Sequence, residues 1–158
     1  MTLAVFPGSF DPITRGHIDL IERATHSFDE IRVLLVHNSK KQTLFTVEER
    51  LQLIKDSTRH LPRVTVDSYE GLTVQYVKEQ GGRAMIRGLR GSSDFEYEMQ
   101  VASINRQFAP EVETYFLATS AELAFISSTI VKEAAKYKQS LSKLVPEAVE
   151  RALIATYV

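Results

Sequence analysis

The feature that most restricts the fold of this chain is a regular alternation of short strand-like segments with longer segments of helical spacing. Each strand-like segment is followed by a helical one, so each new strand can return beside an earlier strand in the same direction. Such βαβ units form parallel sheets with right-handed crossovers. The strands are predicted at residues 3–6, 31–36, 63–66, 83–87 and 113–117.

Local signals predict where the helices begin and end. Apolar residues recur at helical spacing over residues 18–24, and a helix over Leu72–Gln80 would end at two glycines. Two capping boxes, Thr46 with Glu49 and Ser93 with Glu96, predict the starts of two more helices. Two or three helices follow the fifth strand, with Pro146 expected in the first turn of the last one.

Length and composition fit this pattern. The chain has 158 residues, 44% of them hydrophobic and 25% charged, and it contains no repeat or linker-like segment. The predicted fold class is therefore α/β, a single doubly wound domain over residues 1–158 with a five-stranded parallel sheet.

Charge and residue usage exclude several classes of function. The 19 Lys and Arg residues nearly balance 20 Asp and Glu residues, so a nucleic-acid partner is not expected. Cysteine is absent, which removes disulfides and thiolate metal sites, and the four histidines lack the spacing of metal ligands, so no protein-held metal is expected. Without a signal peptide or a long apolar run, a cytoplasmic protein with no membrane partner is expected.

In a doubly wound sheet, ligands bind at the carboxyl ends of the strands, so the segments after each strand are the candidates for a site. Pro7–His17 follows the first strand and matches neither a P-loop nor the dinucleotide fingerprint. Gly8 and Gly16 permit close approach of the backbone, and His17 falls near the start of a helix, where phosphate is favoured. Taken alone, His17 is better explained as a capping or turn residue, whereas the eleven-residue segment as a whole favours a functional site.

Three further segments after strands carry groups that bind phosphate. Lys40 and Lys41 follow the second strand, Arg87 and Arg90 follow the fourth, and Ser127–Thr129 follow the fifth. Glu98, in the helix after the fourth strand, is placed to meet a ribose or a base, or is an ordinary exposed charge. Basic and hydroxyl groups at one sheet edge favour phosphoryl or nucleotidyl transfer by electrostatic stabilisation.

The sequence also resembles a known family. GSFDPITRGH (residues 8–17) resembles the nucleotidyltransferase signature whose core is HxGH or TxGH, with Thr14 and His17 at its ends, and FISST (residues 125–129) resembles the second motif. IRGLRGSSDFEYEMQ (residues 86–100) resembles the bacterial phosphopantetheine adenylyltransferases. The resemblance implies a Rossmann-like nucleotidyltransferase fold and the transfer of the adenylyl group of ATP to 4′-phosphopantetheine, giving dephospho-coenzyme A and pyrophosphate.

The resemblance also implies roles for single residues, Mg²⁺ as cofactor, a homohexamer and possible inhibition by coenzyme A. The matching catalytic residues are His17 and Lys41. The matching ATP contacts are Ser9, Phe10, His17, Gly88, Leu89, Arg90, Glu98, Leu123, Ala124, Phe125, Ile126, Ser127, Ser128 and Thr129. The matching contacts to the second substrate are Ser9, Lys41, Thr73 and Arg87, with Lys40 as the alternative to Lys41. Ser9 stands where many members have Thr, and Leu123 where an aromatic residue is common.

Two other functions remain open from the sequence. One is a related nucleotidyltransferase that acts on nicotinamide mononucleotide or on a phosphorylated alcohol. The sequence of residues 86–100 argues against this alternative. The other is a nucleotide-binding module without catalysis, against which the intact set of His17, Lys41, Arg87 and Arg90 argues. A screen of acceptors with labelled ATP tests the first alternative, and release of pyrophosphate on mixing with ATP, Mg²⁺ and phosphopantetheine tests the second.

Overall fold

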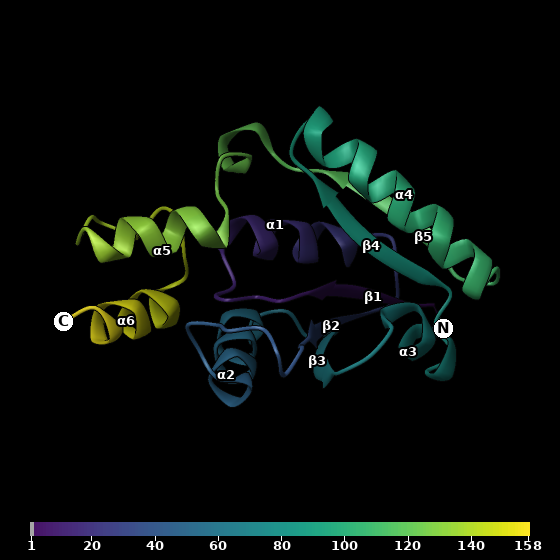
Figure 1. Cartoon of the computed structure of the whole chain (residues 1–158), viewed down its shortest axis with the longest axis horizontal. Coiled ribbons are helices and arrows are strands. Elements are labelled where there is room, and N and C mark those ends of the chain that lie inside the picture. The colour runs from purple at the N-terminus through teal and green to yellow at the C-terminus, as the bar shows by residue number, and fades with distance from the viewer. Residues whose placement is uncertain (1) are drawn as a thin grey trace.

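The computed structural model describes residues 2–158 (Figure 1). Strands and helices alternate through most of the chain, as the sequence predicts. In chain order the elements are β1 (Leu3–Gly8), α1 (Arg15–Ala24), β2 (Glu30–Val36), α2 (Val47–Thr58), β3 (Val64–Tyr69), α3 (Thr73–Glu79), β4 (Ala84–Leu89), α4 (Ser92–Phe108), β5 (Glu113–Ala118), the 3₁₀ helix η1 (Ala121–Leu123), α5 (Ser128–Lys136) and α6 (Glu147–Thr156).

The sheet confirms the predicted fold class. Its five strands lie in the order β3-β2-β1-β4-β5, and all of the pairings are parallel. From β1 the chain winds outward through β2 to β3, then crosses to the other side of β1 to form β4 and β5. The order therefore reverses between β1 and β4, which is where a doubly wound sheet opens a crevice for a ligand.

Alternate residues of the central strand pack into two apolar layers on opposite faces of the sheet. Ala4 and Phe6 face a large core that includes residues of α1, α2, α5 and α6. Val5, between them, faces a smaller core made with α3 and with the chain after α4. This alternation follows from the two-residue period of a strand. Figure 1 shows α5 and α6 together at one end of the molecule and α4 at the other.

Of the two helix starts predicted from capping boxes, one is confirmed and the other is wrong. The capping box at Thr46 is confirmed, since Glu49 N–H donates to Thr46 Oγ1 at 3.1 Å and Thr46 N–H donates to Glu49 Oε1 at 3.0 Å. The box predicted at Ser93 and Glu96 is wrong, because α4 already begins at Ser92, after Gly91, without a side-chain cap.

The predicted strand ends also need correction. β1 and β4 each extend two residues further than predicted and β3 three, because pairing with the neighbouring strand continues through residues that locally favour turns. Gly8, for example, still pairs with Leu35 of β2. Pro146 precedes α6 as its N-cap and does not lie in the first turn. No helix among residues 2–158 has the length and apolar character needed to cross a membrane.

Candidate active site

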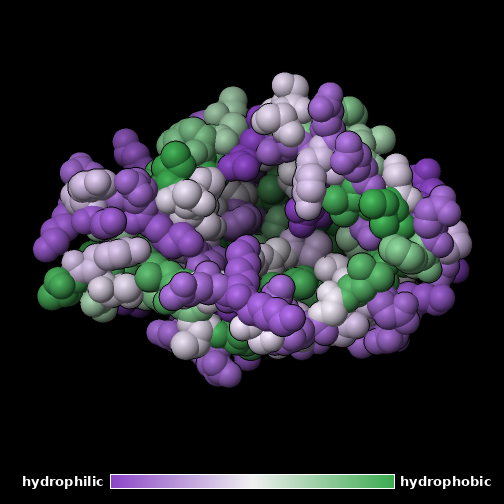
Figure 2. All heavy atoms as spheres, viewed as in Figure 1, coloured by the Kyte–Doolittle hydropathy of each residue, from purple (hydrophilic) through white to green (hydrophobic). Residues whose placement is uncertain are grey.

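A cavity of about 300 Å³ opens at the carboxyl edge of the sheet, between the ends of β1 and β4. Pro7 and Gly8 of β1 form part of its wall together with Arg87 and Gly88 of β4. The start of α1 and the segment that precedes α5 close the other sides. Figure 2 shows the molecular surface hollowed in its middle, with hydrophilic residues along the rim. The cavity thus occupies the crevice that the strand order predicts.

His17 is fixed at the start of α1 by a capping box with Thr14. The backbone N–H of His17 donates to Thr14 Oγ1 at 3.3 Å, and the backbone N–H of Thr14 donates to His17 Nδ1 at 3.0 Å. Since a backbone N–H can only donate, Nδ1 is the acceptor and carries no proton. The proton of the neutral ring is therefore on Nε2, which is left as a hydrogen-bond donor.

The surroundings of His17 keep its imidazole neutral. Burial, together with the positive charges of Arg90 and Arg87, lowers the pKa of His17 from its usual 6.5 to about 4. At neutral pH the ring offers one N–H donor and no net charge. This geometry confirms the predicted position at a helix start and shows that His17 also caps the helix.

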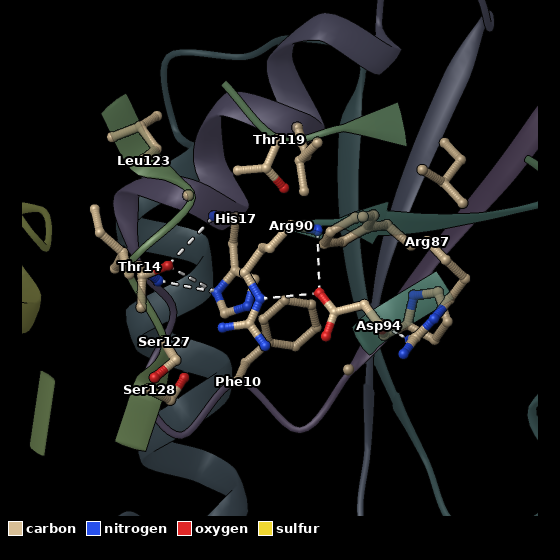
Figure 3. Close-up of a pocket in the computed structure, with 18 of the residues that line it drawn as sticks. Phe10, Thr14, His17, Arg87, Arg90, Asp94, Thr119, Leu123, Ser127 and Ser128 are labelled. Carbon is tan, nitrogen blue, oxygen red and sulfur yellow. Dashed lines mark hydrogen bonds and ion pairs between the residues drawn. The ribbon is translucent and has the colours of Figure 1, made fainter. Parts of the chain in front are cut away.

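Phe10 packs against the His17 ring from an unusual backbone conformation. Its φ is 46°, in the left-handed region that bulky residues rarely adopt, and such a residue costs on the order of 1–3 kcal/mol. The two ring centroids are 5.0 Å apart at an angle of 74°. Gly8 leaves room for this arrangement, because a Cβ there would lie 3.1 Å from the Phe10 ring. In Figure 3 both rings and the Arg90 side chain converge in the cavity.

Two arginines, Arg87 near the end of β4 and Arg90 just beyond it, are each held by a carboxylate of α4. Arg87 donates to Glu98 through Nε at 2.7 Å and Nη2 at 2.8 Å, and its Nη1 donates to the carbonyl of Pro7 at 3.0 Å. Arg90 donates to Asp94 Oδ2 through Nε at 3.2 Å and through its backbone N–H at 3.0 Å. Both guanidinium groups are thereby positioned at the cavity without a ligand.

The segment before α5 forms the wall opposite the arginines. Ser127 is the N-cap of α5, and its Oγ accepts the N–H of Ile130 at 3.1 Å. Ser128 Oγ donates to the carbonyl of Pro12 at 2.8 Å, which ties this segment to the loop after β1. The two hydroxyls therefore hold the wall together, and the N–H groups at the start of α5 remain the donors suited to phosphate.

A second cavity, of about 460 Å³, adjoins the first at Ser9, which lines both. Lys41 and Arg50 bring positive charge to it, and on its wall His37 Nδ1 lies 3.4 Å from Glu70 Oε2. Lys41 lines this cavity and Lys40 does not. The position favours Lys41 over its neighbour for the role predicted from the sequence.

The structure brings most of the predicted site residues together. Those that line the first cavity are Ser9, Phe10, His17, Arg87, Gly88, Arg90, Glu98, Leu123, Ile126, Ser127 and Ser128. Those that line neither cavity are Lys40, Thr73, Leu89, Ala124, Phe125 and Thr129. Glu98 lines the first cavity, but both of its oxygens accept from Arg87, so it acts there as the partner of that arginine. The roles of these residues toward substrates stay predictions.

Sequence reasoning missed several residues of the two cavities. Asp94 carries a signal that could have found it, since it lies four residues after Arg90 at ion-pair spacing for a helix. Thr119 lines the first cavity just beyond β5, and Arg50 lines the second from within α2. Arg50 is an ordinary charged position in the sequence, and only the packing of α2 brings it to the site.

Comparison with known proteins agrees with this geometry. Residues 5–134 match the model of the family described as cytidylyltransferase-like. The chain therefore belongs to the cytidylyltransferase-like family of nucleotidyltransferase enzymes. Within that class it is 54% identical, over 153 residues, to the phosphopantetheine adenylyltransferase of Desulforudis audaxviator (strain MP104C). The match covers 97% of this chain and 94% of that relative, which places the chain in the family of the phosphopantetheine adenylyltransferases.

Proposed function

We propose that this enzyme transfers the adenylyl group of ATP to 4′-phosphopantetheine and forms dephospho-coenzyme A and pyrophosphate. The observation that carries the proposal is the identity of 54% to a phosphopantetheine adenylyltransferase over nearly the whole of both chains. The two adjoining cavities support it, because the reaction needs two phosphate-bearing substrates to meet.

ATP is assigned to the first cavity. Arg90 faces it from the loop after β4, and the N–H groups at the start of α5 lie on the opposite wall. Guanidinium groups and helix N-termini both bind phosphate oxygens. A nucleotide held between these two walls places its α-phosphate near His17.

4′-Phosphopantetheine is assigned to the second cavity, with its phosphate toward Ser9 and Lys41. Ser9 lies where the cavities adjoin, so a phosphate bound there is next to the α-phosphate of ATP. Holding two reactants in contact is itself a large part of catalysis in such transfers.

The chemistry then follows in one displacement. A phosphate oxygen of 4′-phosphopantetheine attacks the α-phosphorus of ATP, and the bond from that phosphorus to the oxygen bridging to the β-phosphate breaks as pyrophosphate leaves. The nucleophile is already an anion, so no strong general base is needed. His17 Nε2–H donates to an α-phosphoryl oxygen, and this contact strengthens as charge redistributes in the transition state.

We also propose that Mg²⁺ enters the site with ATP. Among residues 2–158 no group of three or more His, Asp and Glu side chains is placed to hold a metal ion. The carboxylates that line the first cavity, Asp94 and Glu98, are each engaged by an arginine. Mg²⁺ is commonly held by substrate phosphates and water, and it neutralises the charge of the phosphates. This mode of binding does not require a dedicated set of protein ligands.

The predicted homohexamer remains part of the proposal. α4 exposes several large apolar side chains to solvent, among them Phe95, Tyr97, Ile104 and Phe108, each between 48% and 64% exposed. Several exposed large apolar residues on one helix are typical of a surface that another protein covers. Sedimentation should give about six times the chain mass of 17.9 kDa, and a monomer at micromolar concentration would contradict it. The cytoplasmic location stays a prediction.

The test of the function is pyrophosphate release by the purified protein with ATP, Mg²⁺ and 4′-phosphopantetheine, with dephospho-coenzyme A identified by mass spectrometry. Parallel reactions replace 4′-phosphopantetheine by nicotinamide mononucleotide or by a phosphorylated alcohol. Transfer to one of these and none to 4′-phosphopantetheine would overturn the assignment of the acceptor. Binding of ATP without any transfer would indicate a binding module.

A further inference from the structure

Arg50 is a buried cation that has no role in the proposed reaction as described above. It lies in the first turn of α2 and is only 4% exposed, although it lines the second cavity. No carboxylate among residues 2–158 lies within ion-pair distance of it, whereas both arginines of the first cavity have such a partner. A buried charge is costly unless it is paired, so this position calls for an explanation.

The hydrogen bonds of Arg50 join the two loops that meet at the second cavity. Its Nε donates to the carbonyl of Phe45 at 3.1 Å, in the loop that carries Lys41, and its Nη1 donates to the carbonyl of Ser9 at 2.9 Å. Its Nη2 makes no hydrogen bond within residues 2–158. Nη2 is not among the fully enclosed polar atoms that lack a partner, so it keeps some accessible surface, and Arg50 is a residue that lines the cavity.

The acidic groups around Arg50 are already engaged elsewhere. Asp11 accepts the N–H groups of Leu44 and Phe45 at 2.9 and 3.0 Å and pairs with Lys132 at 3.2 Å. Glu70, on the wall of the same cavity, lies 3.4 Å from His37 Nδ1 and accepts from Ser39 Oγ at 3.3 Å. Carbonyl oxygens satisfy part of the guanidinium but cancel none of its charge. Since Lys41 and Arg50 face one carboxylate, Glu70, the residues that line the second cavity keep a net positive charge.

We infer that the missing counter-charge of Arg50 is the phosphate of the acceptor, and that Arg50 makes the second cavity select a phosphorylated acceptor over its unphosphorylated form. This inference rests on the proposed function. Arg50 acts partly through Ser9, whose carbonyl it holds, and partly through its charge, which is little screened in a buried position. It is a positioning and specificity residue and takes no part in the displacement itself.

The test compares the binding of 4′-phosphopantetheine and of pantetheine, which lacks the phosphate, by calorimetric titration. Arg50→Gln removes the charge and keeps one amide donor for the carbonyls. We expect it to weaken the affinity for 4′-phosphopantetheine roughly 10- to 100-fold, the range of a lost interaction with a charged group. The affinity for pantetheine should change less than about twofold. Arg50→Lys keeps the charge and should retain most of the preference for phosphate.

The control is Arg59→Gln, at the other end of α2, where an exposed arginine pairs with Asp56, and it should leave both affinities unchanged. If Arg50→Gln weakens the affinity for both ligands equally, Arg50 only holds the loops. If it changes neither affinity, Arg50 has no role in binding. Either result overturns the inference. If Arg50→Gln does not fold, a loss of phosphate preference in folded Arg50→Lys overturns it. Failure of the wild-type protein to bind 4′-phosphopantetheine would instead contradict the proposed function.

Discussion

The two cavities carry similar cations in opposite electrostatic settings. In the first, Arg87 and Arg90 each have a carboxylate of α4 as partner, and the Arg87–Glu98 pair is bidentate with Glu98 almost fully buried. In the second, Lys41 and Arg50 make no ion pair within residues 2–158. Cations that are paired are fixed in position before a ligand arrives, whereas unpaired cations leave a net charge that a ligand can complete.

This difference suggests a division of tasks between the two cavities. Fixed donors in a preorganised site stabilise the charge of a transition state without reorganising, so the first cavity suits the chemical step. Unpaired charge contributes chiefly to the binding of an anion, so the second cavity suits selection of the acceptor. Loss of the His17 donor in the first cavity should therefore chiefly lower kcat, and loss of Lys41 or Arg50 in the second should chiefly raise KM for the acceptor.

The largest effect is expected from His17→Ala. Loss of the Nε2 donor should reduce kcat by roughly 10²–10³, with much smaller changes in KM, because the donor acts mainly in the transition state. Steady-state kinetics measures both constants, and circular dichroism checks folding. His26→Ala, at an exposed position just beyond α1, is the matched control. If His17→Ala keeps most of its kcat, His17 is only a cap for α1.

The neutral state of His17 should appear as a pH dependence of stability. The pKa is about 4 in the folded chain and 6.5 in the unfolded one, so between these values only the unfolded state binds the proton. Stability is then fully present above pH 6.5 and is lost as the pH falls toward 4, by on the order of 3 kcal/mol at 1.36 kcal/mol per pKa unit.

Urea unfolding of the wild-type protein and of His17→Ala at several pH values isolates this contribution. The carboxyl groups titrate alike in both proteins, so the difference between their free energies of unfolding reports His17. That difference should shrink by most of the expected amount between pH 7 and pH 4. A constant difference would show that the arginines of the first cavity and burial do not hold the ring neutral.

Lys41→Ala tests the second cavity. We expect KM for 4′-phosphopantetheine to rise roughly 10- to 100-fold, as for loss of a charged hydrogen bond, with little change in KM for ATP. Lys40→Ala is the matched control because Lys40 does not line the cavity, and it should change either KM less than about twofold. A larger rise in KM for Lys40→Ala than for Lys41→Ala would show that Lys40, and not Lys41, contacts the acceptor.

The smallest effects concern the carboxylates that fix the arginines. Glu98→Gln should lower the free energy of unfolding by about 1–3 kcal/mol, since Glu98 is 7% exposed and binds Arg87 through both oxygens. Asp94→Asn should cost less than about 1 kcal/mol, because Arg90 is 45% exposed and its ion pair is screened by water. Chemical denaturation of both variants measures the two losses in free energy of unfolding. Equal losses would show that the buried and the exposed ion pair contribute alike.

Features that depend on residues close together in the chain could be predicted from the sequence. The alternation of periodicities predicted the parallel sheet, and the helix start at His17 was correctly placed because capping is a local interaction. The positions of Lys41 and Arg90 after strands, and of Arg87 near the end of one, placed them at the carboxyl edge, since the carboxyl ends of parallel strands share one edge of the sheet. Most of the candidate site could be predicted for that reason.

The ion pairs between these groups, and their distribution over two cavities, depend on tertiary packing. The strand ends at Gly8 and Leu89 depend on hydrogen bonds to neighbouring strands, which override local turn preference. The four loops separate into two cavities that adjoin at Ser9, and Arg50 reaches one of them from within a helix. The pairing of Arg87 with Glu98 spans a strand end and a helix. Each of these results from packing between segments far apart in the sequence, which no local pattern encodes.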